Sequence, residues 1–309
     1  MIEPFQNSLI LTGPTASGKS ALALELAERL KAEIISADSM TVYRGMDIGT
    51  AKPSAEDQQR IPHHLVDELD PWESASVAWW LKRAAECVRD IESRGRRAMF
   101  VGGTPLYLKA LLCGLFDGPP RDADVRARLE HEAATTGNEL LHARLAAVDP
   151  ASAGRLHSND VRRVVRALEV WELSGKPLGE WQQQGWWGDG EPAFGPEVCF
   201  ALDIPRPILY DRIDTRVRGM FDSGWVEEVR RLADNKLGWS REASMALGYR
   251  EIREHLSGGR SLADTILEVQ LRTRQFAKRQ LTWFRGLAGV RFATAKEVAG
   301  IWATDGSTR

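Results

Sequence analysis

Cysteine is scarce in this chain of 309 residues, and the three that occur lie far apart at positions 87, 113 and 199. No two of them form a Cys-x-x-Cys pair, so the pattern excludes a disulfide-stapled scaffold and a zinc ribbon. We therefore expect Cys87, Cys113 and Cys199 to pack as small hydrophobic side chains.

Long apolar runs and an excess of one charge are also missing. No window approaches 18 continuous apolar residues, and Glu3 stands where a signal peptide would carry basic residues, so we expect no membrane span, no export and a cytoplasmic location. The 41 basic and 43 acidic residues give a net charge of −2. Any surface that binds nucleic acid must therefore be a local patch.

The remaining composition, 43% hydrophobic and 27% charged residues, is typical of a globular protein, and the length suits about two domains. Residues 13–20 read GPTASGKS and match the phosphate-loop pattern G-x-x-x-x-G-K-[ST]. An apolar run at residues 9–11 precedes them, and leucines at 22, 26 and 30 predict a following helix. The alternative is an ordinary glycine-rich turn, and the pattern alone does not identify the molecule that carries the phosphates.

Three more apolar runs, at residues 33–37, 98–101 and 198–202, predict further strands of a parallel sheet. Asp38 follows the first of these, where the carboxyl ends of strands line a ligand crevice. A catalytic carboxylate and an Asx cap of the next turn are equally good interpretations. Thr104 follows the next run and can cap a helix that begins at Pro105. No acidic magnesium ligand ends that strand, which argues against an ordinary ATPase.

The sequence pattern changes after residue 117, from alternating strand and helix signals to helix signals alone. We expect an α/β core at 1–117 and 197–309, of the P-loop NTPase-like class with a parallel sheet flanked by helices, and an all-helical insertion at 118–196. Arg162 and Arg166 lie four apart in the insertion, with Arg163 adjacent, and could grip a nucleic-acid backbone or form a solvated basic face.

Two basic segments follow in the core. Arg212 and Arg216 are four apart on one helix face and could clamp a diphosphate or a phosphodiester. Residues 270–285 hold five basic side chains and no acidic one, with Phe276, Trp283 and Phe284 among them. Such a helix suits RNA contact, although the aromatic side chains could equally face the core.

Seven strings in this order resemble the tRNA dimethylallyltransferase family: GPTASGKS at 13–20, ISADSMTVYRGMDIGTAKP at 35–53, PHHLVD at 62–67, GGTPLY at 102–107, RLHSNDVRRVVRALEV at 155–170, LGYRE at 247–251 and TRQFAKRQLTWFR at 273–285. The resemblance spans most of the chain. It implies transfer of dimethylallyl from dimethylallyl diphosphate to N6 of adenosine 37 in the tRNA anticodon stem-loop, with Mg²⁺ as cofactor and the protein acting as a monomer.

The resemblance also implies roles for individual residues. Asp38 is the base, and Thr104 and Arg216 complete the catalytic set. The diphosphate-binding residues are Gly13, Thr15, Ala16, Ser17, Gly18, Lys19 and Ser20, of which Ser20 holds Mg²⁺. The tRNA-binding residues are Asp38, Ser39, Met40, Thr41, Thr104, Arg126, Arg162, Arg163, Val164, Val165, Arg166, Gly248 and Tyr249.

Two residues depart from the family pattern. Thr41 stands where many members have Gln, and Pro105 stands where Gly is usual. Two other functions share parts of the pattern: a small-molecule kinase would use the phosphate loop but not the basic aromatic helix, and a non-catalytic RNA-binding protein would not need Asp38.

Overall fold

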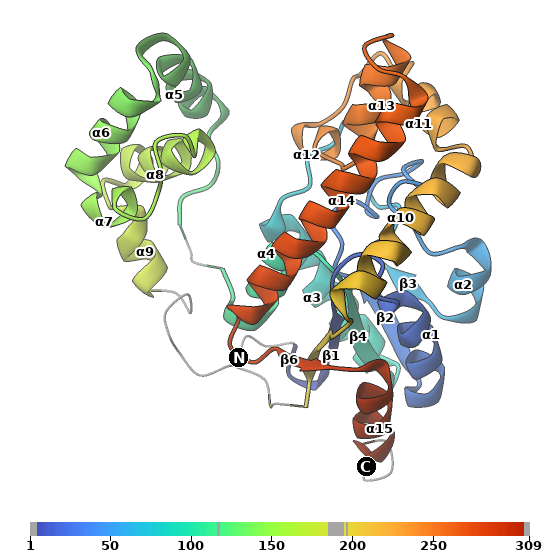
Figure 1. The fold of residues 1–309 in the computed structure, drawn as a ribbon. Coiled ribbons are helices and arrows are strands. Elements are labelled where there is room, and N and C mark those ends of the chain that lie inside the picture. The colour runs from blue at the N-terminus through green and yellow to red at the C-terminus, as the bar shows by residue number, and fades with distance from the viewer. Residues whose placement is uncertain (1–4, 116–117, 185–194, 196, 306–309) are drawn as a thin grey trace. The chain divides into compact units, whose positions relative to one another are not determined.

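The computed structural model describes residues 5–115, 118–184, 195 and 197–305 of the chain (Figure 1). Within them lies a six-stranded sheet in the order β3-β2-β4-β1-β5-β6, with every neighbouring pair parallel. The strands are β1 (Leu9–Thr12), β2 (Ala32–Ser36), β3 (His63–His64), β4 (Arg97–Gly102), β5 (Cys199–Leu202) and β6 (Arg291–Ala293). The predicted α/β class with a parallel sheet is confirmed.

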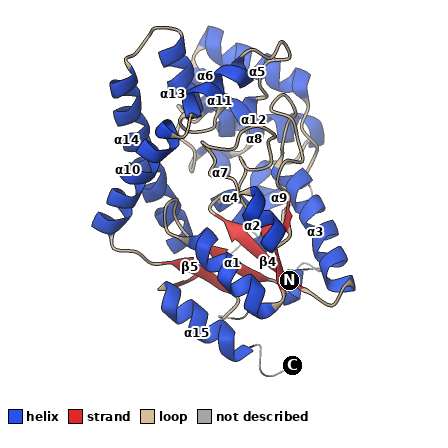
Figure 2. Ribbon diagram, turned by 90° about the vertical axis from the view of Figure 1, so that its right-hand side faces the viewer, coloured by secondary structure: helices blue, strands red, loops and turns tan. Residues whose placement is uncertain are grey.

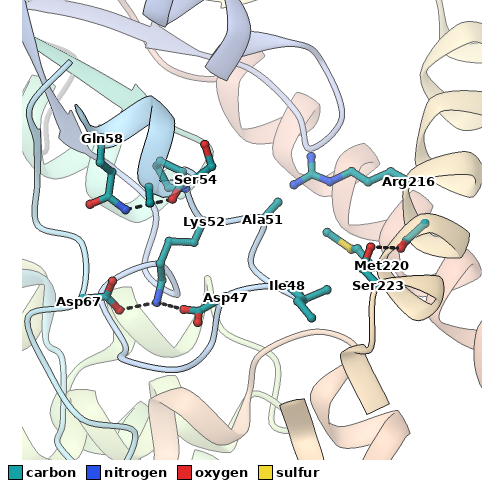
Figure 3. A pocket seen from close by; sticks show the side chains of 13 residues that line it. Asp47, Ile48, Ala51, Lys52, Ser54, Gln58, Asp67, Arg216, Met220 and Ser223 are labelled. Carbon is teal, nitrogen blue, oxygen red and sulfur yellow. Dashed lines mark hydrogen bonds and ion pairs between the residues drawn. The ribbon is translucent and has the colours of Figure 1, made fainter. Parts of the chain in front are cut away.

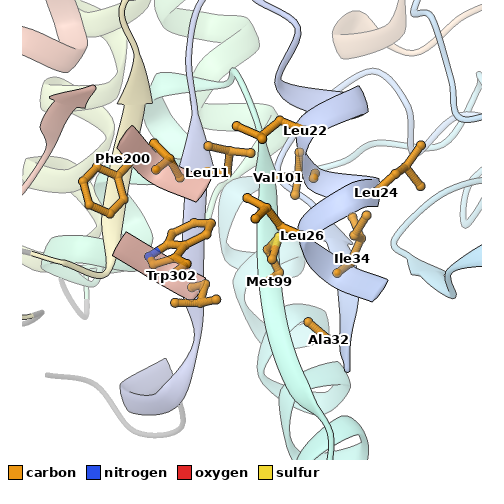
Figure 4. Packing of buried hydrophobic residues seen from close by; sticks show 14 of the residues in the cluster. Leu11, Leu22, Leu24, Leu26, Ala32, Ile34, Met99, Val101, Phe200 and Trp302 are labelled. Atoms are coloured by element: carbon orange, nitrogen blue, oxygen red, sulfur yellow. The ribbon is translucent and has the colours of Figure 1, made fainter. Parts of the chain in front are cut away.

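Both faces of the sheet are covered, which explains why its central strands read as nearly continuous apolar runs (Figure 2). On one face, Leu11 and Met99 pack in a cluster with α1 (Lys19–Leu30) and with Trp302 of α15 (Ala295–Asp305) (Figure 4). On the other face, Phe100 lies against Trp80 of α3 (Val77–Ser93), with 6.1 Å between the ring centroids. Neighbouring residues of one strand thus serve opposite layers.

The chain folds as two compact units, one of residues Met1–Leu112 with Glu191–Arg309 and one of residues Cys113–Gly190. The remaining helices of the first unit are α2 (Ala55–Arg60), α3 (Val77–Ser93), α4 (Pro105–Cys113), α10 (Arg206–Asp222), α11 (Trp225–Ala233), α12 (Arg241–Ser244), α13 (Tyr249–Leu256) and α14 (Leu262–Arg285). None of the described helices combines the length and hydropathy that a membrane span requires.

The second unit is helical throughout its described part. It consists of α5 (Ala123–Thr136), α6 (Asn138–Val148), α7 (Pro150–Ala153), α8 (Val161–Ser174) and α9 (Leu178–Gln184). Leu129, Leu145 and Leu168 form part of its buried core. Its bounds differ by a few residues from the expected insertion at 118–196, and residues 116–117, 185–194 and 196 near the two junctions are outside the described part.

The order of the strands fixes where a ligand crevice can form. From β1 the chain proceeds to β2 and β4 on one side of the sheet and later to β5 and β6 on the other. In open α/β sheets, ligands bind outside the carboxyl ends of the strands at such a change of direction. The loops that follow β1, β2 and β4 all begin at this edge.

Candidate active site

The loop after β1 turns tightly into helix α1. Gly13 and Gly18 adopt φ angles of 150° and 88°. A Cβ on Gly13 would lie 2.9 Å from Ser17 Oγ and 3.3 Å from the Leu202 Cβ, so a larger residue does not fit there. Because α1 begins at Lys19, directly after the loop, its free N–H groups face the same space and favour an anion.

The loops after β2 and β4 approach each other closely beside this turn. A Cβ on Gly102 would lie 2.1 Å from the Ala37 carbonyl oxygen, so glycine is required at the contact. Thr104 Oγ1 accepts a hydrogen bond from the Ser39 N–H at 3.0 Å and faces Ser39 Oγ at 3.3 Å. Helix α4 begins at Pro105 as predicted, and the Thr104 carbonyl accepts bonds from the Tyr107 and Leu108 N–H groups at 3.1 Å, while the Thr104 hydroxyl ties the two loops together.

Asp38 adopts the Asx arrangement and still offers one carboxylate oxygen to the cavity. Its Oδ1 accepts a hydrogen bond from the Met40 N–H at 2.9 Å, which is the Asx geometry. Its Oδ2 makes no hydrogen bond with any residue that the structure describes and remains available to a ligand. Thr41 is buried, and its hydroxyl lies 2.7 Å from Ser36 Oγ. Thr41 therefore stabilises the loop internally, where a longer Gln would have to adopt another arrangement.

These strand ends form the floor of a cavity of about 500 Å³. Its lining includes Thr15, Ala16, Lys19, Ser20, Asp38, Ser39, Met40, Thr41, Thr104, Arg216 and Tyr249, together with Thr273, Phe276, Arg279 and Gln280 of α14. Ser17, Gly18 and Gly248 adjoin lining residues in the chain without lining the cavity themselves, and Gly13 lies two residues before the lining residue Thr15. The structure thus brings together the phosphate loop, Asp38, Thr104 and Arg216 from four separate segments.

The cavity has an electrostatic field that favours an anion. Burial lowers the pKa of Lys19 to about 8, with the charge of Arg216 as the second cause and Asp38 acting in the opposite direction. Burial likewise lowers the pKa of Arg216, again against the effect of Asp38. The Arg212 Nη1 atom lies 3.8 Å from the position of a Cβ built on Gly18. Three cations therefore surround the phosphate loop, and one carboxylate lies beside them.

A second cavity, of about 620 Å³, adjoins the first and shares Arg216 with it (Figure 3). Lys52 is buried in its wall, where its ammonium lies 2.5 Å from a carboxylate oxygen of Asp47 and of Asp67 and donates to the Tyr43 carbonyl at 2.7 Å. Lys52 is thus fully engaged. Arg216 forms no hydrogen bond or ion pair with any described side chain, so its donors are available to a ligand.

Comparison with known proteins identifies the relatives of this chain. Residues 41–287 match the family model described as IPP transferase, and residues 6–68 match that of isopentenyl transferase. A tRNA dimethylallyltransferase of Geobacter metallireducens is 50% identical over 279 residues, which cover 90% of this chain and 89% of the relative. The chain belongs to the tRNA dimethylallyltransferase family.

Solved structures of this family share the fold. The tRNA isopentenylpyrophosphate transferase of Bacillus halodurans is 37% identical, with a TM-score of 0.69 and 98% of both chains covered. A eukaryotic dimethylallyltransferase acting on tRNA is 27% identical, with a TM-score of 0.78 over 98% of this chain and 77% of that one. These findings confirm the predicted family, the P-loop-like fold and the prenyltransferase class.

The family-implied tRNA residues of the helical unit fall into three groups. Arg162 and Arg163 are exposed, and Arg163 pairs only loosely with Asp160, at 3.3 Å. Val164 and Val165 are each about 1% exposed and belong to the core of the unit. The side chains of these two valines therefore pack inside the unit, and a tRNA contact at these positions stays a prediction.

Arg126 and Arg166 are held inside the helical unit. Both bind Glu169, which is completely buried: Arg126 forms two bonds of 2.8 Å, and Arg166 forms one of 2.6 Å. Arg166 also donates to the Pro119 carbonyl at 2.9 Å. Losing either arginine would leave this carboxylate with one cation, so we assign them first to the stability of the unit. Asp160 occupies the N-cap position of α8 but makes no side-chain cap bond.

Glu228 of α11 organises the wall of the cavity but carries no signal in the sequence. Its buried carboxylate accepts bonds from the N–H groups of Asp47, Ile48 and Gly49, at 2.9, 2.7 and 3.3 Å, and from the Tyr249 hydroxyl at 2.6 Å. It thereby joins the loop of residues 47–49 to the start of α13. Three of its four donors are backbone groups, which any residue type can supply.

Proposed function

We propose that this chain transfers the dimethylallyl group of dimethylallyl diphosphate to N6 of adenosine 37 in tRNA, beside the anticodon. The observation that carries the proposal is one cavity that contains an anion site, a carboxylate with a free oxygen and Thr104. In the reaction, the N6 nitrogen bonds to C1 of the prenyl group, the C1–O bond breaks, and diphosphate leaves with the bonding electrons. One N6 proton must be removed.

The phosphate-loop end of the cavity suits the leaving group. Lys19 and Arg216 can bind the diphosphate oxygens, and the N-terminus of α1 adds the positive end of its dipole. Charge on the diphosphate grows as the C1–O bond breaks, so these groups bind the transition state more strongly than the substrate. The partly desolvated cations do not have to be reoriented for this purpose.

The Asp38 end suits the acceptor. The exocyclic amine of adenine is a weak nucleophile because its lone pair is delocalised into the ring. Asp38 Oδ2 can take the proton as the new bond forms, while Oδ1 stays fixed by the Met40 N–H. Thr104 holds the loop of Asp38 through Ser39 and thus fixes the direction of the base.

The residues present also fit Mg²⁺. Ser20 offers a hydroxyl at the cavity, and a diphosphate would supply further oxygen ligands of the kind that Mg²⁺ prefers, together with water. Within the described residues, no group of three His, Cys, Asp or Glu side chains could form an all-protein cage. We therefore propose that Ser20 holds the metal jointly with the substrate. Bound Mg²⁺ would neutralise part of the diphosphate charge.

For the tRNA, we propose that Arg162 and Arg163 contact the phosphate backbone and that the adenine leaves its stack to reach Asp38. Their exposure supports the first point, and the recessed position of Asp38 in the cavity wall supports the second. We propose that the protein acts as a monomer, because one chain supplies every group named here.

Mass spectrometry of tRNA nucleosides tests the proposal directly. Incubation of the protein with tRNA, Mg²⁺ and dimethylallyl diphosphate should add one dimethylallyl group to adenosine 37. A matched reaction with ATP in place of the prenyl diphosphate should leave the tRNA unchanged. Absence of the product together with tRNA-stimulated ATP hydrolysis would replace this proposal with a kinase or a non-catalytic RNA-binding switch.

A further inference from the structure

Gln280 joins helix α14 to the phosphate loop. Its side chain is 2% exposed, and its Oε1 accepts a hydrogen bond from the Thr15 N–H at 2.9 Å. Its Nε2 donates to the Gly103 carbonyl at 2.6 Å. The orientation of the Gln280 amide is defined by these partners. In the flipped orientation, Nε2 would face the Thr15 N–H, another donor, and Oε1 would face the Gly103 carbonyl, another acceptor. One side chain thus bridges the loops that follow β1 and β4.

The contact between Gln280 and Gly103 is too close for any side chain at position 103. A Cβ on Gly103 would lie 2.5 Å from Gln280 Nε2 and 3.5 Å from Lys19 Nζ. The Gln280 amide therefore lies close to the phosphate-loop lysine as well as to the turn that leads to Thr104. Thr15 is one of the residues expected to bind the diphosphate, but its N–H already donates to Gln280. The part that Thr15 plays in diphosphate binding therefore depends on Gln280.

The same face of α14 continues along the cavity. Thr273, Phe276 and Arg279 line it at intervals of three residues, and Gln280 follows directly. Of the five basic side chains in residues 270–285, Arg272 pairs with Glu251 and Glu268, and Arg274 pairs with Asp214. Among the described residues, the other three, Lys278, Arg279 and Arg285, form no ion pair and are available to RNA phosphates. An RNA bound along this face would contact the same helix, α14, that is hydrogen-bonded to the phosphate loop through Gln280.

We propose that Gln280 is a positioning residue that couples RNA bound along α14 to diphosphate bound in the phosphate loop; this inference rests on the proposed function. The bridge has to be in place for the loop to bind the diphosphate well, and RNA bound to α14 stabilises the bridge. Because coupling between two ligands is reciprocal, diphosphate must then tighten RNA binding by the same factor.

The test compares Gln280→Met with Gln270→Met. Met matches the length of Gln and removes both hydrogen bonds. Gln270 is the matched control, because it lies on the same helix, is 3% exposed and donates to the Asp214 carbonyl at 3.0 Å, but forms no hydrogen bond with either loop in the described part of the chain. Calorimetry would measure the affinity for dimethylallyl diphosphate with and without an anticodon stem-loop. Hydrogen exchange of residues 13–18 would report on the loop itself.

Gln280→Met should weaken diphosphate binding by about tenfold, the scale of two neutral hydrogen bonds, and bring the coupling factor close to one. Exchange in the phosphate loop should become faster. Gln270→Met should keep the wild-type affinity and coupling. Equal effects of the two variants, or a wild-type protein in which the ligands bind independently, would overturn the inference. Failure of the wild type to bind either ligand would instead contradict the proposed function.

Gln280→Glu keeps the test decisive if the Met variant does not fold. The carboxylate preserves the acceptor for the Thr15 N–H, loses the donor to Gly103 and adds a negative charge near Lys19. We expect weaker diphosphate binding, a smaller coupling factor and faster exchange in residues 13–18, because the Gly103 carbonyl loses its donor. Wild-type affinity and coupling in Gln280→Glu would overturn the inference.

Discussion

The lowered pKa of Lys19 predicts the direction in which diphosphate binding changes with pH. Burial and, second, the charge of Arg216 lower it from 10.5 to about 8, against the opposing effect of Asp38. A bound diphosphate stabilises the ammonium form, so above pH 8 the lysine must take up a proton as the ligand binds. The affinity for dimethylallyl diphosphate should therefore fall as the pH rises through this value.

The expected size follows from the same pKa. A value of about 8 leaves roughly nine tenths of Lys19 protonated at pH 7 and roughly one tenth at pH 9. If only the ammonium form binds, the apparent Kd rises about tenfold, or about 1.4 kcal/mol. Folding responds in the opposite direction. The Lys19 amine binds its proton more tightly in the unfolded chain than in the folded one. The contribution of Lys19 to the free energy of unfolding therefore rises between pH 8 and 10.5. The titration of Lys19 thus weakens diphosphate binding at high pH without destabilising the fold.

Two substitutions should move the midpoint in opposite directions. Asp38→Asn removes the charge that raises the pKa of Lys19, so its binding curve should fall at lower pH. Arg216→Gln removes a charge that lowers it, so the curve should fall at higher pH, although overall binding is weaker. Lys19→Met should bind weakly at every pH. Calorimetry without metal, between pH 6.5 and 9.5 at constant ionic strength and in two buffers of different ionisation enthalpy, measures both affinity and proton uptake.

The reasoning would be refuted by a wild-type affinity that is constant over this range with no proton uptake. It would equally fail if Asp38→Asn and Arg216→Gln shifted the midpoint in the same direction. Either outcome would mean that Lys19 does not meet the diphosphate in its ammonium form, whatever the rate of prenyl transfer.

Three variants test the other parts of the site. Asp38→Asn should lower the single-turnover rate by about 10²-fold or more with little change in tRNA affinity, because the acceptor loses its base; near-normal turnover would exclude that role. Replacing Arg162 and Arg163 with Ala should reduce the slope of log affinity for tRNA against log salt by about one unit for each lost phosphate contact, and an unchanged slope would show that neither meets phosphate. Glu228→Gln should raise the KM for tRNA, because an amide would turn donors toward the N–H groups of residues 47–49. If only the melting temperature changes, this carboxylate supports the fold alone.

Much of the catalytic end of the site could be predicted from local sequence. The phosphate loop needs glycine at fixed positions, and buried parallel strands read as apolar runs, so the ends of β1, β2 and β4 were located correctly. Asp38 and Thr104 each lie two residues after one of these strand ends. Since parallel strands bring their carboxyl ends to one edge, proximity in space followed from the strand assignment alone.

In the helical unit, the apolar spacing predicts burial for two residues, Val164 and Val165, to which the family resemblance assigns tRNA binding. The apolar spacing of Val161, Val164, Val165 and Leu168 already predicts one buried helix face, and the structure buries the last three of these. The salt bridge of Arg166 to Glu169 has the spacing i, i+3 and was visible in the sequence as well. The partner Arg126 lies on another helix, so the complete burial of Glu169 could not be read locally.

Strands β3 and β6 were missed for a different reason. They are two and three residues long, and their residues are not all buried, so they carry no apolar run that a sequence pattern could detect. They pair at the two edges of the sheet, where the register is set by neighbours already in place.

The remaining parts of the site depend on contacts that leave no mark in the sequence. Gln280 reaches the Thr15 N–H across 265 residues, and Glu228 reaches the Asp47 N–H across 181. In both cases a polar side chain binds backbone N–H groups, which every residue except proline offers, so no residue type at the far end reveals the contact. A chain that ended before α14 would keep the phosphate-loop motif intact. Thr15 and Gly103 would nevertheless lose the partner that holds them together, so the motif alone is not sufficient to build the diphosphate site.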